Sequence, residues 1–379
     1  MKIKEITGFL ETIAHPSLQE NYDNAGLITG NPETTCSGVI CALDATEVVV
    51  NEAIQKKCNL IIAHHPIVFV GLKKITGKNY VERTIIAAIK NDIAIYAIHT
   101  NLDNVLQGVN GKIASLFGLL NIAILLPKEN TLKKLYTYVP ENKAEQVRQA
   151  IFNAGGGQIS SYSECSFNTK GEGTFKAGID TSPYVGEIGK RHQENEIKIE
   201  AILPSFLENQ VIAAMKAAHP YEEVAFEVIA LSNKHPETGA GITGYLPEEM
   251  DEKEFLDKVK SVFKVPVVKH TRLTGKKVKK IAICGGAGNF LISKALATDS
   301  QAYITSDLKY HEYFDADNRI LLIDVGHYES EQFTIDYLSE VLGKKFPNFA
   351  VLKTELITNP VHYFFSICQV ISAKPSNKV

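Results

Sequence analysis

Apolar segments of strand length alternate with helical segments through the first third of the chain, and this alternation constrains the fold most strongly. Strand–helix–strand units of this length form parallel sheets with right-handed crossovers. The carboxyl ends of such strands lie at one edge of the sheet, where α/β proteins place their sites. We therefore expect functional residues directly after the strands. The predicted strands span 37–44, 59–65 and 93–103, with helices over 45–57 and 80–92.

The pattern changes near residue 132 and returns to the α/β type after residue 234. The intervening segment reads as strand, helix, glycine turn, further strands, helix and strand, with two short strands predicted at about 158–167 and 173–179. This is roughly the β-α-β-β-α-β plan of an antiparallel sheet with helices on one face. Pro and Gly residues in "NKHPETGAGITG" mark its end. We expect an α/β fold with a two-lobed core and parallel or mixed sheets over 1–130 and 235–379, interrupted by an inserted α+β, ferredoxin-like domain at 131–234.

Composition and charge argue against several classes of partner. The 379 residues carry a formal net charge of −3, so nucleic acid is not favoured as a partner. No apolar stretch approaches the ~20 residues of a membrane span, and the amino-terminal residues lack the pattern of a secretory signal. The six cysteines are scattered without a C-x-x-C pair, as expected of reduced thiols. We expect a cytoplasmic protein without a membrane partner.

Three predicted strand ends carry residues of the kind that bind metal ions. His64 and His65 end one apolar run, and the next ends in "YAIHTNLDNV", which contains His99 and Asp103. The third is "LLIDVGHYESEQF", in which a histidine and a glutamate four residues later open a helix. Positions four apart share one helix face, so His327 and Glu331 can hold a metal together.

Each of these residues also has a simpler interpretation. The adjacent histidines could be an accident of a loop, Asp103 a helix cap, Glu331 a partner of the helix macrodipole and His99 a core histidine. Their shared position at strand ends favours metal. Three or four imidazoles and two carboxylates, without cysteine, suit Zn first, or Fe, Mn, Ni or Co. Five ligands exceed the set of one zinc ion, so we expect two divalent ions per chain that share a carboxylate, with His64 and His65 directed one to each.

Six segments give the chain a family resemblance: "YDNAGLITG", "AHHPIVF", "IHTNLDNV", "CGGAGN", "TSDLKYHEYFDAD" and "DVGHYESE". With them the chain resembles the GTP cyclohydrolase I type 2 homologue family, also described as NGG-interacting-factor-three-like dinuclear-metal proteins. The resemblance implies a toroidal homohexamer with its metal sites facing an internal cavity. "AHPYEEVAFEV" in the inserted domain is similar to the PII-like or CutA-like domain of the longer members. The metal ligands implied by the family are His64, His65, Asp103, His327 and Glu331.

Two segments depart from the family pattern. Tyr22 stands where the family often has tryptophan, and "GAGITG" at 239–244 lacks the arginine frequent in the corresponding segment. Neither departure touches the metal ligands. Asp23 and Asn24, in "YDNAGL", resemble a loop of the family and are explained equally well by a turn.

The resemblance implies a hydrolase in which a metal-activated water attacks a nucleotide, in its specific form opening GTP to a dihydropterin triphosphate precursor. His99 is the first candidate for the catalytic acid or base, or for orienting a ligand, and His311 is a weaker one. Two alternatives stay open. The chain could be a non-catalytic metal-binding or regulatory hexamer with an effector-sensing insert, or a phosphoesterase of unknown substrate.

Further candidates lie outside these strand ends. In the insert, His219 and Glu222 could bind a metal, although a helix end before Pro220 is the simpler interpretation. The segment "CGGAGN" could bind a triphosphate through backbone amides, and a tight turn explains it about as well. The candidates for phosphate binding are Gly285, Gly286, Gly288 and Lys309, of which the lysine is more simply a solvated surface residue.

Overall fold

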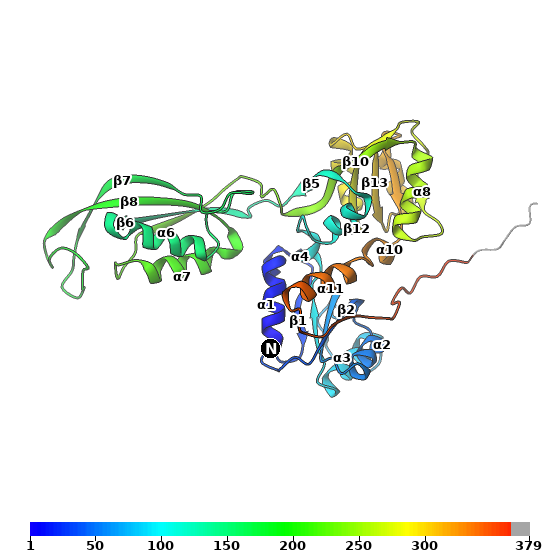
Figure 1. The fold of residues 1–379 in the computed structure, drawn as a ribbon, viewed down its shortest axis with the longest axis horizontal. Helices are drawn as coiled ribbons and strands as arrows, with labels where there is room; N and C mark the ends of the chain where they lie inside the picture. The colour runs from blue at the N-terminus through cyan, green and yellow to red at the C-terminus, as the bar shows by residue number, and fades with distance from the viewer. Residues whose placement is uncertain (365–379) are drawn as a thin grey trace, which may run out of the picture.

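The computed structural model describes residues 1–364, which form three sheets: one in each of two adjoining lobes and one in a projecting module (Figure 1). The first lobe has a five-stranded sheet of order β1-β4-β3-β2-β15, parallel except for β1, which pairs antiparallel with β4. The parallel strand–helix units predicted for this region are therefore confirmed. The strands are β1 (Gly26–Thr29), β2 (Val39–Asp44), β3 (Leu60–His65), β4 (Ala94–Ala97) and β15 (Val351–Lys353).

Alternate residues of the central strands face two apolar layers. Ile40 and Ile61 pack towards α2 and α3, whereas Val39 and Leu60 face a larger core that includes α1 and α11. Because both faces are buried, these strands are apolar throughout, which makes them recognisable in the sequence. The helices of this lobe are α1 (Ile3–Ile13), α2 (Glu47–Gln55), α3 (Tyr80–Lys90), α4 (Thr100–Asp103) and, from the end of the chain, α11 (Thr334–Lys345).

The second lobe has a six-stranded mixed sheet of order β11-β14-β13-β12-β10-β5. Strands β12, β13 and β14 are parallel, and β11, β10 and β5 extend the sheet antiparallel at its two sides. One apolar core joins the lobes, since Ile62 and Ile283 belong to the same cluster. The strands are β5 (Leu120–Pro127), β10 (Gly239–Met250), β11 (Lys269–His270), β12 (Val278–Ala287), β13 (Ala302–Ser306) and β14 (Leu321–Asp324), and the helices are α5 (Val109–Phe117), α8 (Glu252–Phe263), α9 (Ile292–Ala297) and α10 (His327–Glu331).

The projecting module leaves the second lobe after β5 and returns at β10. These two strands pair with each other, with Pro127 opposite Gly239, so the excursion begins and ends at one place in the sheet. Its antiparallel sheet has the order β7-β8-β6-β9, with α6 and α7 together on one face (Figure 1) and an apolar core of its own. The elements are β6 (Leu132–Pro140), α6 (Ala144–Asn153), β7 (Phe167–Lys176), β8 (Arg191–Pro204), α7 (Glu208–Ala218) and β9 (Phe226–Ala230).

Two expectations about local structure are wrong. The glycine-rich segment 239–244, interpreted as loop, forms the start of β10. Gly241 there has φ +61°, and a Cβ would lie 2.8 Å from a Leu291 methyl, so glycine permits a bend that other residues would resist. In the module, the two short strands predicted around 158–179 are replaced by the single strand β7.

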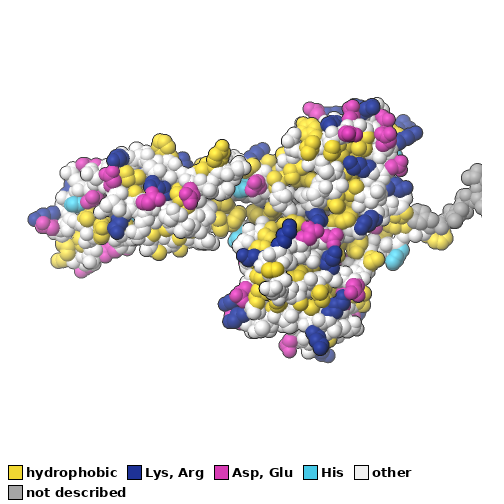
Figure 2. Space-filling model, in the orientation of Figure 1, with side chains coloured by type: hydrophobic (Ala, Val, Ile, Leu, Met, Phe, Trp, Pro, Cys, Tyr) yellow, Lys and Arg dark blue, Asp and Glu magenta, His cyan; other side chains and the backbone are white. Residues whose placement is uncertain are grey.

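Lys and Arg side chains are interspersed with Asp and Glu on the face shown in Figure 2. This mixture agrees with the small net charge and gives that face no basic stripe for a nucleic-acid backbone. Within residues 1–364, no helix is long and apolar enough to cross a membrane.

Candidate metal centre

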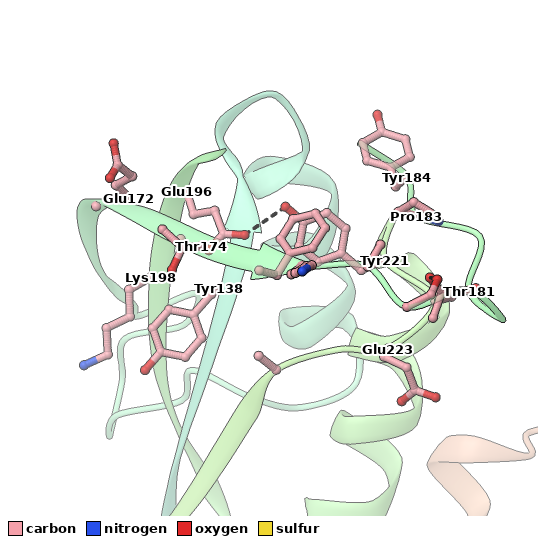
Figure 3. A pocket seen from close by; sticks show the side chains of 18 of the residues that line it. Tyr138, Glu172, Thr174, Thr181, Pro183, Tyr184, Glu196, Lys198, Tyr221 and Glu223 are labelled. Atoms are coloured by element: carbon pink, nitrogen blue, oxygen red, sulfur yellow. Dashed lines mark hydrogen bonds between the residues drawn. The ribbon is translucent and has the colours of Figure 1, made fainter. Parts of the chain in front are cut away.

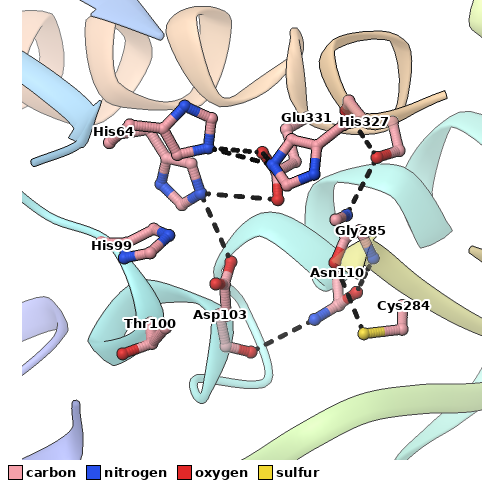
Figure 4. A network of polar contacts seen from close by, with 12 residues as sticks. His64, His99, Thr100, Asp103, Asn110, Cys284, Gly285, His327 and Glu331 are labelled. Carbon is pink, nitrogen blue, oxygen red and sulfur yellow. Dashed lines mark hydrogen bonds and ion pairs between the residues drawn. The ribbon is translucent and has the colours of Figure 1, made fainter. Parts of the chain in front are cut away.

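Four histidines and two carboxylates meet where the carboxyl ends of the parallel strands of both lobes face each other (Figure 4). Strand β3 runs to His65, so the histidine pair belongs to the strand and not to the loop after it. Strand β4 ends at Ala97, earlier than predicted, and His99 is the N-cap of α4, whose last residue is Asp103. The second lobe contributes His327 and Glu331, the first and last residues of α10.

Each of the four imidazoles donates its Nδ1 proton to an oxygen acceptor. The pairs are His64 with the Ile98 carbonyl (2.8 Å), His65 with Asp44 (2.7 Å), His99 with Asp23 (2.8 Å) and His327 with Asp307 (2.6 Å). A neutral imidazole that carries its proton on Nδ1 presents the lone pair of Nε2. When neutral, all four rings would therefore keep the tautomer that offers Nε2 for binding a metal, the arrangement that acceptors around metal-bound histidines usually impose.

The Glu331 carboxylate lies at the centre of the cluster and faces two groups of ligand atoms. Its Oε2 lies 2.8 Å from His65 Nε2 and 3.1 Å from His327 Nε2, and these two nitrogens are 3.3 Å apart. Its Oε1 lies 3.8 Å from His64 Nε2, which is 3.6 Å from Asp103 Oδ1. One carboxylate can thus contribute an oxygen to each of two neighbouring sets of ligands.

Two buried polar atoms in the cluster fit the requirements of a metal ion. His64 Nε2 and Asp103 Oδ1 are buried and have no hydrogen-bond partner in the part of the chain that the structure describes. Their 3.6 Å separation is too long for a hydrogen bond but close to the roughly 3.4 Å between ligands of a tetrahedral ion with bonds of about 2.0–2.2 Å. A divalent ion between them would satisfy both atoms. These residues are therefore suited to hold a divalent metal ion.

The electrostatics of the cluster also favour a cation. Burial lowers the pKa of His65, but hydrogen bonds with Asp44 and Glu331 outweigh burial and raise it to about 10. For His327, burial is likewise outweighed, chiefly by the Glu331 carboxylate, and the pKa rises to about 9. Burial and the nearby Glu331 charge raise the pKa of Asp103 to about 7. Positive charge between these groups is therefore strongly stabilised, and metal ions would take the place of the protons.

A cleft of about 1080 Å³ opens over the cluster between the lobes. His65, His99, Asp103, His327 and Glu331 all line it, so a molecule in the cleft can reach the ligand atoms. His64 is fully buried beneath them.

Several other predicted site residues lie away from the cluster or are engaged elsewhere. His311 is exposed, stacks with Phe314 and meets the Tyr310 ring edge-on, outside the cleft lining. Its candidacy as catalytic acid or base is therefore not supported. Lys309 is also exposed, at the start of the 3-10 helix Tyr310–Ala316, as the simpler interpretation held.

The phosphate-binding interpretation of the glycine segment is not supported either. Gly285 and Gly286 lie within β12 and not in a loop. Their amides already donate to Asn110 Oδ1 and Ser330 Oγ, both at 2.9 Å. Gly288 precedes only a short 3-10 helix, Asn289–Leu291. A close approach explains Gly286 better, because a Cβ there would lie 2.2 Å from Glu331 Oε1.

In the module, the His219 and Glu222 side chains have structural partners. His219 is the C-cap of α7, as the helix-end interpretation predicted. Its Nε2 donates to the Tyr138 carbonyl and its Nδ1 accepts from the Tyr221 amide, while Glu222 accepts from the Ser182 amide. They do not form a metal site in this structure.

Sequence reasoning missed the aspartates that orient the histidines. Asp44 is the register partner of His65 across the parallel strands, so its position at the end of the neighbouring strand was an available signal. Asp307 directly follows β13 in the same way. Asp23 accepts from His99 and from both the amide and the hydroxyl of Thr100, and these bonds outweigh burial and lower its pKa to about 2. Asp23 therefore holds the His99 ring in position, which the turn interpretation did not include.

The fold and the cluster define a two-lobed α/β protein with histidine and carboxylate groups that could hold metal ions. The family model of Duf34/NIF3 (NGG1p interacting factor 3) matches residues 1–360. The chain belongs to this family, as the resemblance of its motifs indicated.

Similar proteins cover almost the whole chain. A Bacillus subtilis protein named GTP cyclohydrolase 1 type 2 homolog is 39% identical over 94% of this chain and 97% of its own length. A protein of the same name from Halalkalibacterium halodurans is 38% identical over 91% and 93%. Among solved structures, a Bacillus cereus protein related to NIF3 has a TM-score of 0.84 at 37% identity, covering 96% of this chain and 99% of that one.

Proposed function

We propose that the chain is a hydrolase that uses two divalent metal ions to attack a nitrogen heterocycle of the nucleotide type. The observation that carries the proposal is the pair of ligand sets that share Glu331. His65 and His327 would hold one ion, and His64 and Asp103 the other. When bound, two such ions would lower the pKa of a water molecule towards neutrality and so supply the nucleophile.

The protein's own groups would position the substrate and move protons. His99 lines the cleft beside the cluster, and Asp23 holds its Nδ1, so its Nε2 can accept or donate a proton at a reacting atom. Ring opening of GTP with loss of formate, the reaction class in the name of the relatives, is the specific form to test first.

The test is turnover by metal-reconstituted protein, followed by formate release and pterin fluorescence. Loss of formate release in His327→Ala, with retention in His311→Ala, is the expected result, because only the first histidine belongs to the cluster. Protein that holds two metal ions per chain yet releases no formate from GTP, and leaves other nucleotides and nucleosides intact, would contradict the hydrolase.

A cavity in the projecting module favours a second candidate, a metal-binding regulator with an effector-sensing insert. The cavity measures about 610 Å³ and lies on the module's sheet (Figure 3), where Tyr221 donates to Glu196 at 2.8 Å. The β7-β8-β6-β9 order supports the ferredoxin-like, PII-like identity of the module. An effector that binds there, weakened by Tyr221→Phe and not by His327→Ala, together with absent turnover, would favour this candidate.

We also propose that the chain assembles as a ring-shaped homohexamer. Strand β7 supports it, because it forms a ten-residue sheet edge with exposed side chains such as Phe167, and proteins usually cover such edges. Light scattering should give six times the chain mass of 41.7 kDa. A monomeric mass would contradict this part of the proposal and leave the metal centre untouched.

A further inference from the structure

Aromatic side chains with large exposed areas line the cleft above the metal ligands. Tyr22 is 66% exposed and Phe69 48%, and both belong to the lining. Tyr80 and Phe290, 61% and 55% exposed, line the cleft as well. Large apolar rings left open in a concave site usually mark a surface that a ligand covers.

The aromatic surface reaches the reacting centre. Tyr22 and Phe69 lie nearly parallel, with an interplanar angle of 22° and ring centroids 6.5 Å apart. Phe69 in turn meets His99 edge-on, at 5.7 Å between centroids. A flat ring stacked on these side chains would therefore lie next to His99 and the ligand atoms.

Positive side chains do not accompany the aromatic ones. Among the described residues that line the cleft, none is lysine or arginine. The Lys128 ammonium near its edge is occupied by Glu20 and by the carbonyls of Leu18 and Gln19. Lys73 and Lys74 are exposed on the loop beyond Leu72.

The metal centre itself would not supply surplus positive charge. Five carboxylates either offer a ligand atom or hold a histidine ring: Asp23, Asp44, Asp103, Asp307 and Glu331. Two divalent ions bring four positive charges, fewer than these carboxylates carry when ionised. A triphosphate would thus enter a site with no net positive charge, where its desolvation would go uncompensated.

We infer that the cleft recognises the planar heteroaromatic ring of a nucleobase or nucleoside and does not recognise a phosphate chain attached to it. This inference rests on the proposed hydrolase for the orientation of the ring towards the metals. It deepens that proposal by separating the heterocycle, which the aromatic residues bind, from the triphosphate, for which the cleft offers no cationic side chain. The cleft volume of about 1080 Å³ is ample for a nucleoside.

The test is calorimetric titration of zinc-loaded, full-length protein with guanosine, GMP and GTP at several salt concentrations, with metal content measured before and after. The expected result is a Kd for guanosine equal to or lower than that for GTP, with little dependence on salt. A GTP affinity more than tenfold higher, or binding that weakens steeply with salt, would overturn the inference and indicate phosphate recognition by the metals or by cations of another copy. Absence of binding by all three would overturn it too.

Variants of the aromatic surface locate the binding. Phe69→Leu should weaken guanosine binding about tenfold, the scale of one lost stacking face, whereas Phe69→Tyr should keep it. Both should retain the metal content, because Phe69 is not a ligand. Guanosine binding as tight as that of the wild-type protein in both Phe69→Leu and Tyr22→Ala would contradict the inference. Since binding is measured without turnover, failure of hydrolysis would overturn only the proposed function.

Discussion

Replacing Asp44 by asparagine tests whether the aspartates around the cluster set its affinity for metal. Asp44 accepts the Nδ1 proton of His65 at 2.7 Å and a hydroxyl hydrogen bond from Thr358. Asparagine keeps the shape and an acceptor oxygen but removes the charge. A charge-assisted hydrogen bond contributes about 1.5–3 kcal/mol, or about ten- to hundredfold in affinity.

We expect the lower end of that range, about a tenfold weaker Kd for zinc, because the Asp44 side chain remains 31% exposed and solvent screens part of the charge. Competition with a chromogenic chelator measures the Kd, and Asp257→Asn, an exposed carboxylate on α8, is the matched control. Wild-type affinity in Asp44→Asn, with the fold shown intact by circular dichroism, would refute the assigned role of this hydrogen bond.

Three further predictions concern the same centre. Zinc affinity should rise more than tenfold per pH unit between pH 6 and 8. In the metal-free protein the pKa of His65 is about 10 and that of His327 about 9, so both hold protons in this range that zinc must displace. A pH-independent Kd would contradict this. Thr358→Val should weaken zinc binding by about threefold, less than Asp44→Asn, since it removes one hydrogen bond to the Asp44 carboxylate. A larger loss of affinity in Thr358→Val than in Asp44→Asn, measured by chelator competition, would refute this. Asp103→Asn should leave the metal-free protein equally stable or up to about 1 kcal/mol more stable in urea, while metal content falls from two ions to one. The reason is that it removes the charge of a carboxylate whose Oδ1 is buried and has no hydrogen-bond partner among the described residues. A strongly destabilised metal-free variant would argue for a structural role.

The strands that bear the candidate ligands were predictable because they are buried on both faces. Continuous apolar runs reveal β2, β3 and β14, and ligand-type residues directly after such runs point to one sheet edge. The sequence could not show that two sheets bring their edges together, since this depends on the core shared by residues such as Ile62 and Ile283.

Local signals failed where tertiary contacts decide the backbone. The glycines of "GAGITG" and the first two of "CGGAGN" were interpreted as loop or turn, yet they lie in the paired strands β10 and β12. Gly286 is also needed because Glu331 approaches it closely. The orienting role of Asp23 was equally hidden. Its partners His99 and Thr100 are more than 70 residues away, and a turn explained the same residue.

Anomalous diffraction from crystals of the zinc-loaded protein, at the zinc absorption edge, would show whether two ions share the Glu331 carboxylate. We expect two peaks per chain, about 3.5–4 Å apart as in other two-metal sites, on either side of the Glu331 carboxylate. One peak should lie by His65 and His327 and the other by His64 and Asp103. A single peak, or peaks that leave His64 and Asp103 without a metal, would contradict the shared carboxylate on which the proposed function depends.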